Sequence, residues 1–151
     1  MPLRVYNTLS REKEEFIPLS GKKVGMYVCG VTSYDFCHMG HARAYITFDM
    51  VRRWLEFRGY EVKHVQNFTD VDDKIISKAR KEGDPQKAME IASRFIDEYY
   101  TDMDALGIRR AHVFPKVSEH IPEIVAFVKR LLEKGIAYEV DGDVLYDVSK
   151  F

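Results

Sequence analysis

Residues 27–43, YVCGVTSYDFCHMGHAR, concentrate side chains that bind ligands or metals. This segment holds both cysteines, two of the five histidines and two of the nine glycines of the chain. Three kinds of site use such residues: a metal knuckle, a redox-active cysteine pair, or a phosphate-binding turn that opens a helix. The residue types and their spacing discriminate among the three.

His38 and His41 favour the phosphate-binding turn. They are three residues apart at the expected start of a helix, so their side chains lie on one face. Gly40 leaves the backbone open to a ligand, and the helix N-terminus offers unpaired N–H groups and the positive end of the dipole. Two exposed histidines at an ordinary helix start are the simpler alternative. The preceding strand and glycine turn favour a site that binds triphosphate and stabilises the charge that develops as it is split.

The cysteines form no recognisable redox or metal motif. Seven residues separate Cys29 from Cys37, whereas a CxxC pair has two, and two cysteines make no disulfide scaffold in a chain of 151 residues. The zinc pattern HExxH needs a different histidine spacing and a glutamate, and the segment has neither. Cys29 ends a predicted strand, where it is either a small apolar side chain or one zinc ligand with partners elsewhere. Cys37 is interpreted as structural.

A second polar segment, NFTDVDDKI at residues 67–75, follows the next predicted strand. Thr69 stands at the carboxyl edge of the sheet, where open α/β folds bind ligands, and we expect it to donate a hydrogen bond there. The carboxylates of Asp70, Asp72 and Asp73 suggest magnesium. Their position just before a helix favours caps and first-turn acids instead.

Hydrophobic spacing predicts the elements that position these groups. Residues 22–30 predict a strand that stops at Gly30, and residues 38–58 predict a helix that stops at Gly59. A second strand is predicted over residues 61–68, so that the three elements form a βαβ unit with a right-handed crossover. The helical spacing is carried by Ala44, Phe48, Val51 and Leu55.

Three further helices and a hairpin are predicted after this unit. Residues 70–83 start acidic and end basic, which suits a helix macrodipole. Asp84-Pro85 predicts the start of a long helix that stops at Gly107, and residues 119–134 predict another that stops at Gly135. Alternation around Asp141-Gly142 predicts a hairpin with a three-residue loop. The predicted inward residues are Ala88, Ile91, Phe95, Tyr99, Met103 and Leu106 in the long helix, and Ile121, Ile124, Val128, Leu131 and Leu132 in the last one.

Composition bounds the class of protein. Hydrophobic residues make up 46% and charged residues 31% of the chain, as in globular domains. The formal net charge of −1 gives no long-range field toward nucleic acid, although it does not exclude such a partner. Neither a signal run nor an apolar run of membrane length is present, so we expect no membrane partner and a reducing, cytoplasmic compartment. A single parallel strand pair needs more cover and more strands, so we expect an N-terminal piece of something longer.

The motifs MYVCGVTSYDFCHMGHAR and NFTDVDDKI together closely resemble the N-terminal catalytic region of the cysteinyl-tRNA synthetases. The likeness runs from VYNTLSREKEEF to GDVLYDV, nearly the whole chain. Residues 38–41, HMGH, are similar to the HIGH signature of class I aminoacyl-tRNA synthetases. The resemblance implies an α/β, Rossmann-like nucleotide-binding fold with a parallel sheet. Residues 1–110 would be the first half of this catalytic domain, and residues 111–151 the start of an α+β connective insertion with a helix and a hairpin.

The resemblance also implies roles for single residues. His38 and His41 are the catalytic pair and bind the phosphates of ATP, and the ATP site is assigned to Thr32, His38, Gly40 and His41. The amino-acid pocket is assigned to Cys29, Gly30 and Thr69. Cys29 is the first ligand of a zinc ion that binds the thiol of the substrate cysteine. The family's other three zinc ligands, its Lys-Met-Ser-Lys-Ser loop and its tRNA-reading domains are expected downstream of residue 151.

The implied reaction has two steps. The carboxylate of cysteine attacks the α-phosphate of ATP, held with Mg²⁺, and gives cysteinyl-adenylate and pyrophosphate; the cysteinyl group then passes to tRNA(Cys). Zinc distinguishes cysteine from serine because a thiolate–metal bond has no good hydroxyl equivalent. The enzyme is expected to be a monomer, and the 151-residue chain alone to be inactive and to bind zinc weakly or not at all. Two alternatives stay open: a cysteine ligase of the mycothiol-synthesis type, and a non-catalytic nucleotide-binding module.

Overall fold

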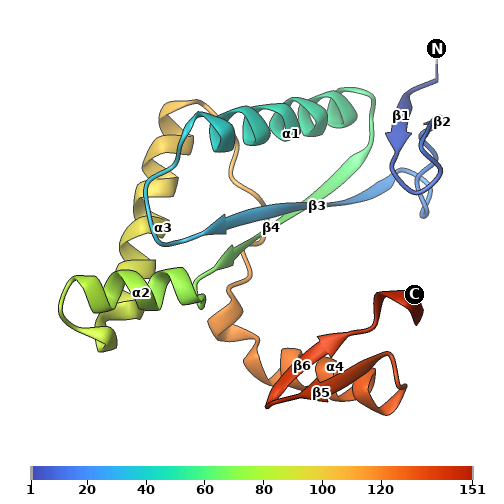
Figure 1. The fold of residues 1–151 in the computed structure, drawn as a ribbon. Helices are drawn as coiled ribbons and strands as arrows, with labels where there is room; N and C mark the ends of the chain where they lie inside the picture. Colours follow the sequence, from blue (N-terminus) through green and yellow to red (C-terminus); the bar gives the residue numbers. More distant parts are fainter. Residues whose placement is uncertain (1, 151) are drawn as a thin grey trace. The chain divides into compact units, whose positions relative to one another are not determined.

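A computed structural model describes residues 2–150 of the chain (Figure 1). The elements in chain order are β1 (Arg4–Asn7), β2 (Glu12–Glu15), β3 (Lys23–Thr32), α1 (Met39–Phe57), β4 (Glu61–Thr69), α2 (Asp73–Lys81), η1 (Pro85–Lys87), α3 (Ala88–Ala105), η2 (Val117–Glu119), α4 (Ile121–Glu133), β5 (Ala137–Val140), β6 (Asp143–Tyr146) and η3 (Val148–Lys150). They divide into two compact units. Unit 1 comprises the chain up to Gly30, Phe36–Gln66 and Asp97–Phe114; unit 2 comprises Val31–Asp35, Asn67–Ile96 and the chain from Pro115 on.

The predicted βαβ unit is present as β3, α1 and β4. The two strands are neighbours in one sheet and run in the same direction (Figure 1), which confirms the predicted α/β class with a parallel strand pair. β3 continues two residues beyond the predicted stop at Gly30 and ends at Thr32. The predicted stop of α1 is correct, since Gly59 adopts a φ of +82°, a left-handed conformation that ends helices.

The apolar core of unit 1 lies between α1 and the sheet. Val24 of β3, Leu55 of α1 and Val62 of β4 are buried together. The antiparallel hairpin of β1 and β2, which sequence spacing does not predict, brings further apolar groups to this cluster. The partly buried side chains packed against it are Leu3, Phe16, Met26 and Tyr60.

The buried face of α1 differs from the predicted one. Its buried residues are Tyr45, Asp49, Arg52 and Leu55, while Phe48 and Val51 are 41% and 40% exposed. The predicted face is therefore wrong at Phe48 and Val51. The physical reason is that Asp49 and Arg52 are buried with partners, so that polar residues occupy positions that apolar spacing alone assigns to solvent.

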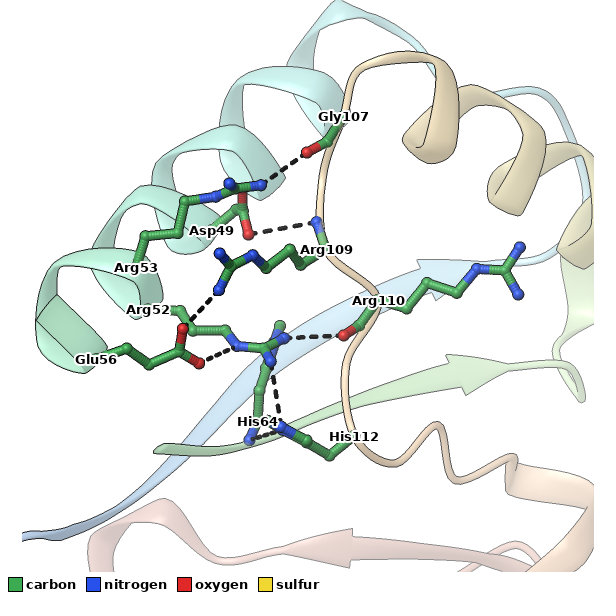
Figure 2. A network of polar contacts seen from close by, with 9 residues as sticks. All are labelled: Asp49, Arg52, Arg53, Glu56, His64, Gly107, Arg109, Arg110 and His112. Atoms are coloured by element: carbon green, nitrogen blue, oxygen red, sulfur yellow. Dashed lines mark hydrogen bonds and ion pairs between the residues drawn. The ribbon is translucent and has the colours of Figure 1, made fainter. Parts of the chain in front are cut away.

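Their partners lie on α1 itself and on the segment that follows α3 (Figure 2). Arg52 donates to the Glu56 carboxylate at 2.9 Å and to the carbonyl oxygen of Arg110 at 2.8 Å. Asp49 accepts from the backbone N–H of Arg109 at 3.3 Å. Buried charges are tolerated only when they are paired and hydrogen-bonded, and this network meets that condition.

Unit 2 has its own core between α2 and the first half of α3. Ile75 and Ala79 of α2 are buried with Ile91, Ala92 and Phe95. The predicted inward face of α3 is confirmed at Ile91, Phe95, Tyr99 and Met103, each of which is buried. It is wrong at Leu106, which follows the end of the helix and is 47% exposed. Asp84 accepts from the backbone N–H of Gln86 at 2.9 Å, as a cap should, but it caps the short η1 that leads into α3.

The last helix and hairpin of unit 2 correct two predictions. Ile121 and Ile124 of α4, predicted inward, are each 42% exposed. The helix of 13 residues packs against β5, a strand of four residues that is too short to cover its whole apolar face. In the hairpin, Val140 pairs directly with Asp143, so the loop has two residues and the predicted three-residue loop is wrong. Asp141 and Gly142 both have positive φ, 52° and 91°, which is the requirement of a two-residue type I′ turn. Among residues 2–150, no helix is long and apolar enough to cross a membrane.

Candidate active site

The N-terminus of α1 is capped by the two histidines themselves. The backbone N–H of Gly40 donates to Nδ1 of His38 at 3.0 Å, and the backbone N–H of His38 donates to Nδ1 of His41 at 3.2 Å. This is a reciprocal capping box, in which His38 is the N-cap and His41 the third helical residue. Serine or threonine with glutamate usually fills these positions. Here two imidazoles do so, and each keeps its Nε2 on the ring edge away from the cap.

Gly40 admits the capping ring. A Cβ atom at residue 40 would lie 2.8 Å from Cε1 and 2.9 Å from Nδ1 of His38. Any other residue at this position would force the imidazole to move. The glycine predicted to open the backbone to a ligand therefore also has a contact inside the chain.

A column of rings connects the cap to the end of the strand within unit 1. The rings of His38 and His41 stack with centroids 3.9 Å apart, and the ring of Tyr45 continues the stack 6.4 Å from that of His41. The Tyr45 hydroxyl donates to the carbonyl oxygen of Cys29 at 3.4 Å. Tyr45 is buried, and burial raises the pKa of its hydroxyl, so it stays a neutral donor. Tyr45 thus connects the stacked rings of His38 and His41 to the backbone of Cys29, a residue of the predicted pocket.

Sequence reasoning did not select Tyr45. Its spacing from His38 and His41 (three, then four residues) places all three on one helix face. This spacing would have identified Tyr45 as a residue on the same face as the two histidines. The expected face, built on Ala44 and Phe48, is one residue out of phase with it.

The two cysteines differ in environment. Both are free thiols; Cys29 is exposed, and Cys37 is half-buried. Burial raises the pKa of the Cys37 thiol to about 11, with the negative charge of Asp102 adding to the effect. A thiol that stays protonated at neutral pH is a poor nucleophile and a poor metal ligand, which suits the structural role predicted for Cys37.

Thr32, assigned to the ATP site, and Thr69, assigned to the amino-acid pocket, both belong to unit 2. The backbone N–H of Ser33 donates to the carbonyl oxygen of Thr69 at 3.1 Å. The Thr69 hydroxyl accepts from the Asn67 amide at 3.3 Å, so its own proton is left to donate elsewhere. Beside it, the fully buried Ser33 hydroxyl has no hydrogen-bond partner among the described residues.

The three aspartates after β4 have structural contacts. Asp72 is the N-cap of α2 and accepts from the backbone N–H of Lys74 at 2.8 Å, and Asp73 lies in the first turn. Asp70, predicted as a cap or first-turn acid of this helix, instead accepts from the backbone N–H of Ser118 at 2.9 Å and from its hydroxyl. Residues 2–150 contain no group of three or more His, Cys, Asp or Glu side chains placed to hold a metal ion. Cys29, the predicted zinc ligand, is an exposed thiol, and the described residues do not complete a zinc site around it.

The fold is that of aminoacyl-tRNA synthetase catalytic domains. A putative arginyl-tRNA synthetase from Campylobacter jejuni superposes with a TM-score of 0.66 at 14% identity, covering 88% of this chain and 39% of that one. Methionyl-tRNA synthetase from Mycobacterium tuberculosis, solved with methionyl-adenylate, superposes with a TM-score of 0.63 at 20% identity, covering 83% and 29%. At such identities the likeness concerns the fold alone.

Sequence comparison identifies the family of the chain within this fold class. Residues 15–151 match the family described as tRNA synthetases class I (C) catalytic domain, and the chain belongs to this family. A protein named cysteine–tRNA ligase from Clostridioides difficile (strain 630) is 54% identical over 99% of this chain and 32% of its own length. One of the same name from Archaeoglobus fulgidus is 55% identical over 99% of this chain and 32% of its own length. The chain thus spans about a third of the length of these curated relatives.

Proposed function

We propose that the protein to which this chain belongs is a cysteine–tRNA ligase, which activates cysteine with ATP to cysteinyl-adenylate and transfers the cysteinyl group to tRNA(Cys). The observation that carries the proposal is the pair of imidazoles that caps α1, in a chain 54–55% identical over nearly its full length to relatives with this name. We further propose that it acts as a monomer in the cytoplasm. The division at residue 110 into half a catalytic domain and the start of an insertion is part of the same proposal.

The cap supplies what nucleotidyl transfer needs from a protein. Attack on the α-phosphate leaves little covalent work, so that positioning and charge stabilisation give most of the acceleration. His38 and His41 offer two N–H donors on the outer ring edges, beside the positive end of the α1 dipole. Thr32 and Gly40 complete the proposed ATP site, and Mg²⁺ accompanies the phosphates. Donors fixed before the reaction stabilise developing charge without having to reorganise.

Cys29, Gly30 and Thr69 form the proposed amino-acid pocket. The exposed Cys29 thiol suits a metal ligand, and Tyr45 holds the Cys29 backbone through its carbonyl oxygen. Zinc would select cysteine over serine when bound, because it prefers a thiolate to a hydroxyl. Its remaining ligands are proposed to come from parts of the longer protein outside this chain.

Cysteine-dependent exchange of pyrophosphate into ATP, measured on the longer protein, tests the first step. We expect exchange with cysteine and little with serine, and a loss of about 10²–10³ in rate for His38→Ala or His41→Ala, as for removal of one transition-state donor. Charging of tRNA(Cys) then tests the second step. Exchange without charging, together with amide formation on an amino sugar, would support the mycothiol-type ligase; a folded protein without any exchange would support the non-catalytic module.

A further inference from the structure

The hydrogen bonds of the cap constrain where each imidazole carries its proton. Nδ1 of His38 accepts from Gly40, and Nδ1 of His41 accepts from His38. Both donors are backbone N–H groups, which cannot reverse their role. A ring nitrogen that accepts a hydrogen bond bears no proton, so a neutral imidazole in this position carries its single proton on Nε2.

The same contacts oppose a positive charge on either ring. An imidazolium has an N–H on both nitrogens, so that charging one ring replaces a cap bond by a donor facing a donor. The two rings stack with centroids 3.9 Å apart at the positive end of the α1 dipole, where two cations would repel each other. Burial lowers the pKa of His41, and the neighbouring His38 lowers it further, in agreement with this geometry.

We propose that the reciprocal cap holds His38 and His41 as neutral Nε2–H tautomers, so that the site presents two uncharged N–H donors to its ligand rather than two cations or a general base. The consequence for catalysis rests on the proposed function: the two Nε2–H groups donate to phosphate oxygens of ATP. The tautomers themselves follow from the fold and are measurable without ATP.

Gly40 is the positioning residue of this arrangement. Its missing side chain leaves the space that the His38 ring occupies, since a Cβ there would lie 2.9 Å from Nδ1. Gly40→Ala is expected to displace the His38 ring and break the bond to its Nδ1. Met39 is the matched control, because it lies in the same turn of α1 with its side chain 83% exposed.

Long-range ¹H–¹⁵N NMR of the 151-residue chain, labelled with ¹⁵N in its five histidines, reads the tautomers directly. At neutral pH we expect two rings with Nδ1 at the shift of an unprotonated nitrogen and Nε2 at that of a protonated one. His38→Asn and His41→Gln assign them, each by removing one set of signals. Gly40→Ala should move the His38 signals toward the tautomer mixture of free imidazole, and Met39→Ala should leave them unchanged. A proton on Nδ1 of either ring, an imidazolium, or averaged shifts in the unsubstituted chain would overturn the proposal.

Paired substitutions separate this proposal from the proposed function. His38→Asn places an acceptor where Nδ1 of His38 lies but no group where Nε2 lies. His38→Gln places a polar group at the Nε2 position but no acceptor at the Nδ1 position, so the helix loses its cap. His38→Asn should keep His41 in its Nε2–H form and lose about 10²–10³ in the exchange rate of the longer protein. His38→Gln should retain more exchange than His38→Asn. If the tautomers are as proposed and His38→Asn exchanges at the full rate, the tautomer proposal stands and the assigned phosphate contact fails; if the rings tautomerise freely, the tautomer proposal fails whatever the rates.

Discussion

Single side chains at the candidate site perform two tasks each. Each capping imidazole uses Nδ1 to complete α1 and leaves Nε2 for a ligand. Tyr45 fills the core with its ring and holds the Cys29 backbone with its hydroxyl. A substitution that deletes a whole side chain removes both of its contacts at once. Conservative changes that remove one contact and keep the other are therefore more informative.

Tyr45→Phe tests the link between α1 and the end of β3. The change removes the hydroxyl that donates to the Cys29 carbonyl oxygen and keeps the ring stacked near His41. We expect a stability loss of about 0.5–1.5 kcal/mol, the usual net worth of one hydrogen bond. In thermal unfolding this corresponds to a midpoint lowered by about 1–6 °C for a chain of this size. Tyr138→Phe, at a hydroxyl-bearing ring that is 47% exposed, is the control. Equal midpoints for the two variants would contradict the assigned bond.

Cysteine alkylation tests the environments of the two thiols. With its pKa raised to about 11, the Cys37 thiol is almost wholly protonated at neutral pH. In a Cys29→Ser variant, the iodoacetamide reaction at Cys37 should therefore be slow and keep accelerating as the pH is raised toward about 11, because the thiolate is the nucleophile. Mass spectrometry of the labelled chain gives the rates. A rate that levels off near neutral pH would show that Cys37 is not buried as described.

The candidate site was predictable where a motif is local and unpredictable where it depends on packing. Spacing and residue type selected His38, Gly40 and His41, and the structure places them in one cap. The sequence did not indicate that the two histidines cap the helix for each other, because serine, threonine and glutamate normally fill that role. Asp70 looked like another acid of the α2 start, and its partner Ser118 lies 48 residues away in the chain. No pattern within one segment reports such a contact.

Among the elements, α1 shows how polar burial misleads periodicity. Apolar spacing predicted Phe48 and Val51 inward, whereas Asp49 and Arg52 are buried because the segment after α3 supplies their partners (Figure 2). The strands β3 and β4 (to within two residues), the glycine stops of α1 and α3 and the βαβ order followed from the sequence, because glycine stops and strand runs are local signals. The hairpin loop length did not, since alternation alone does not tell whether Asp141 adopts a positive φ.

We expect His64 to make unit 1 sensitive to acid. Its ring is buried on β4, and neither ring nitrogen has a hydrogen-bond partner among the described residues. Burial lowers the pKa of His64, and the charge of Arg52 and the neighbouring His112 lower it further, while Asp49 opposes them. The unfolded chain therefore binds a proton more readily than the folded one. The stability that this adds is present above the unfolded pKa of about 6.5 and is lost as the pH falls toward the lowered folded value.

Denaturant unfolding from about pH 8 to about pH 5 measures this loss, and His64→Leu is the informative variant. Because both ring nitrogens lack partners, an apolar side chain of similar size should leave stability at neutral pH unchanged or higher. It should also flatten the fall between about pH 6.5 and about pH 5. His120→Gln, at an exposed ring of unit 2, should leave the slope as it is. A His64→Leu chain with an unaltered slope would assign the acid sensitivity to other groups.

Asp70 joins the end of β4 to the start of η2 within unit 2. Its buried carboxylate accepts from both the backbone N–H and the hydroxyl of Ser118. Asp70→Ala leaves that backbone group without its acceptor, and we expect a loss of about 1–3 kcal/mol in the free energy of unfolding. Ser118→Ala removes only the hydroxyl bond and should cost less. Urea titration of both variants measures the order, and a larger cost for Ser118→Ala would contradict the assigned bonding.

At the scale of the whole molecule, the proposed zinc site combines one thiol of this chain with ligands from other segments. One thiolate, that of Cys29, is the zinc ligand proposed within this chain, whereas zinc in proteins is held by three or four side chains. No group of three or more metal-binding side chains occurs within residues 2–150. Zinc content therefore reports whether the proposed pocket has been completed by the rest of the protein.

The expected outcome is a contrast between the 151-residue chain and the longer protein. After dialysis against a weak chelator, the chain should retain far less than one zinc per molecule, and the longer protein should retain one. In the longer protein, Cys29→Ser should release most of the metal and reduce the preference for cysteine over serine in pyrophosphate exchange, while Cys37→Ser should change neither. Elemental analysis by mass spectrometry gives the metal content, and exchange rates with the two amino acids give the preference. Stoichiometric zinc bound by the chain alone through Cys29, or full zinc in the longer Cys29→Ser protein, would refute the assignment of this thiol as a shared ligand.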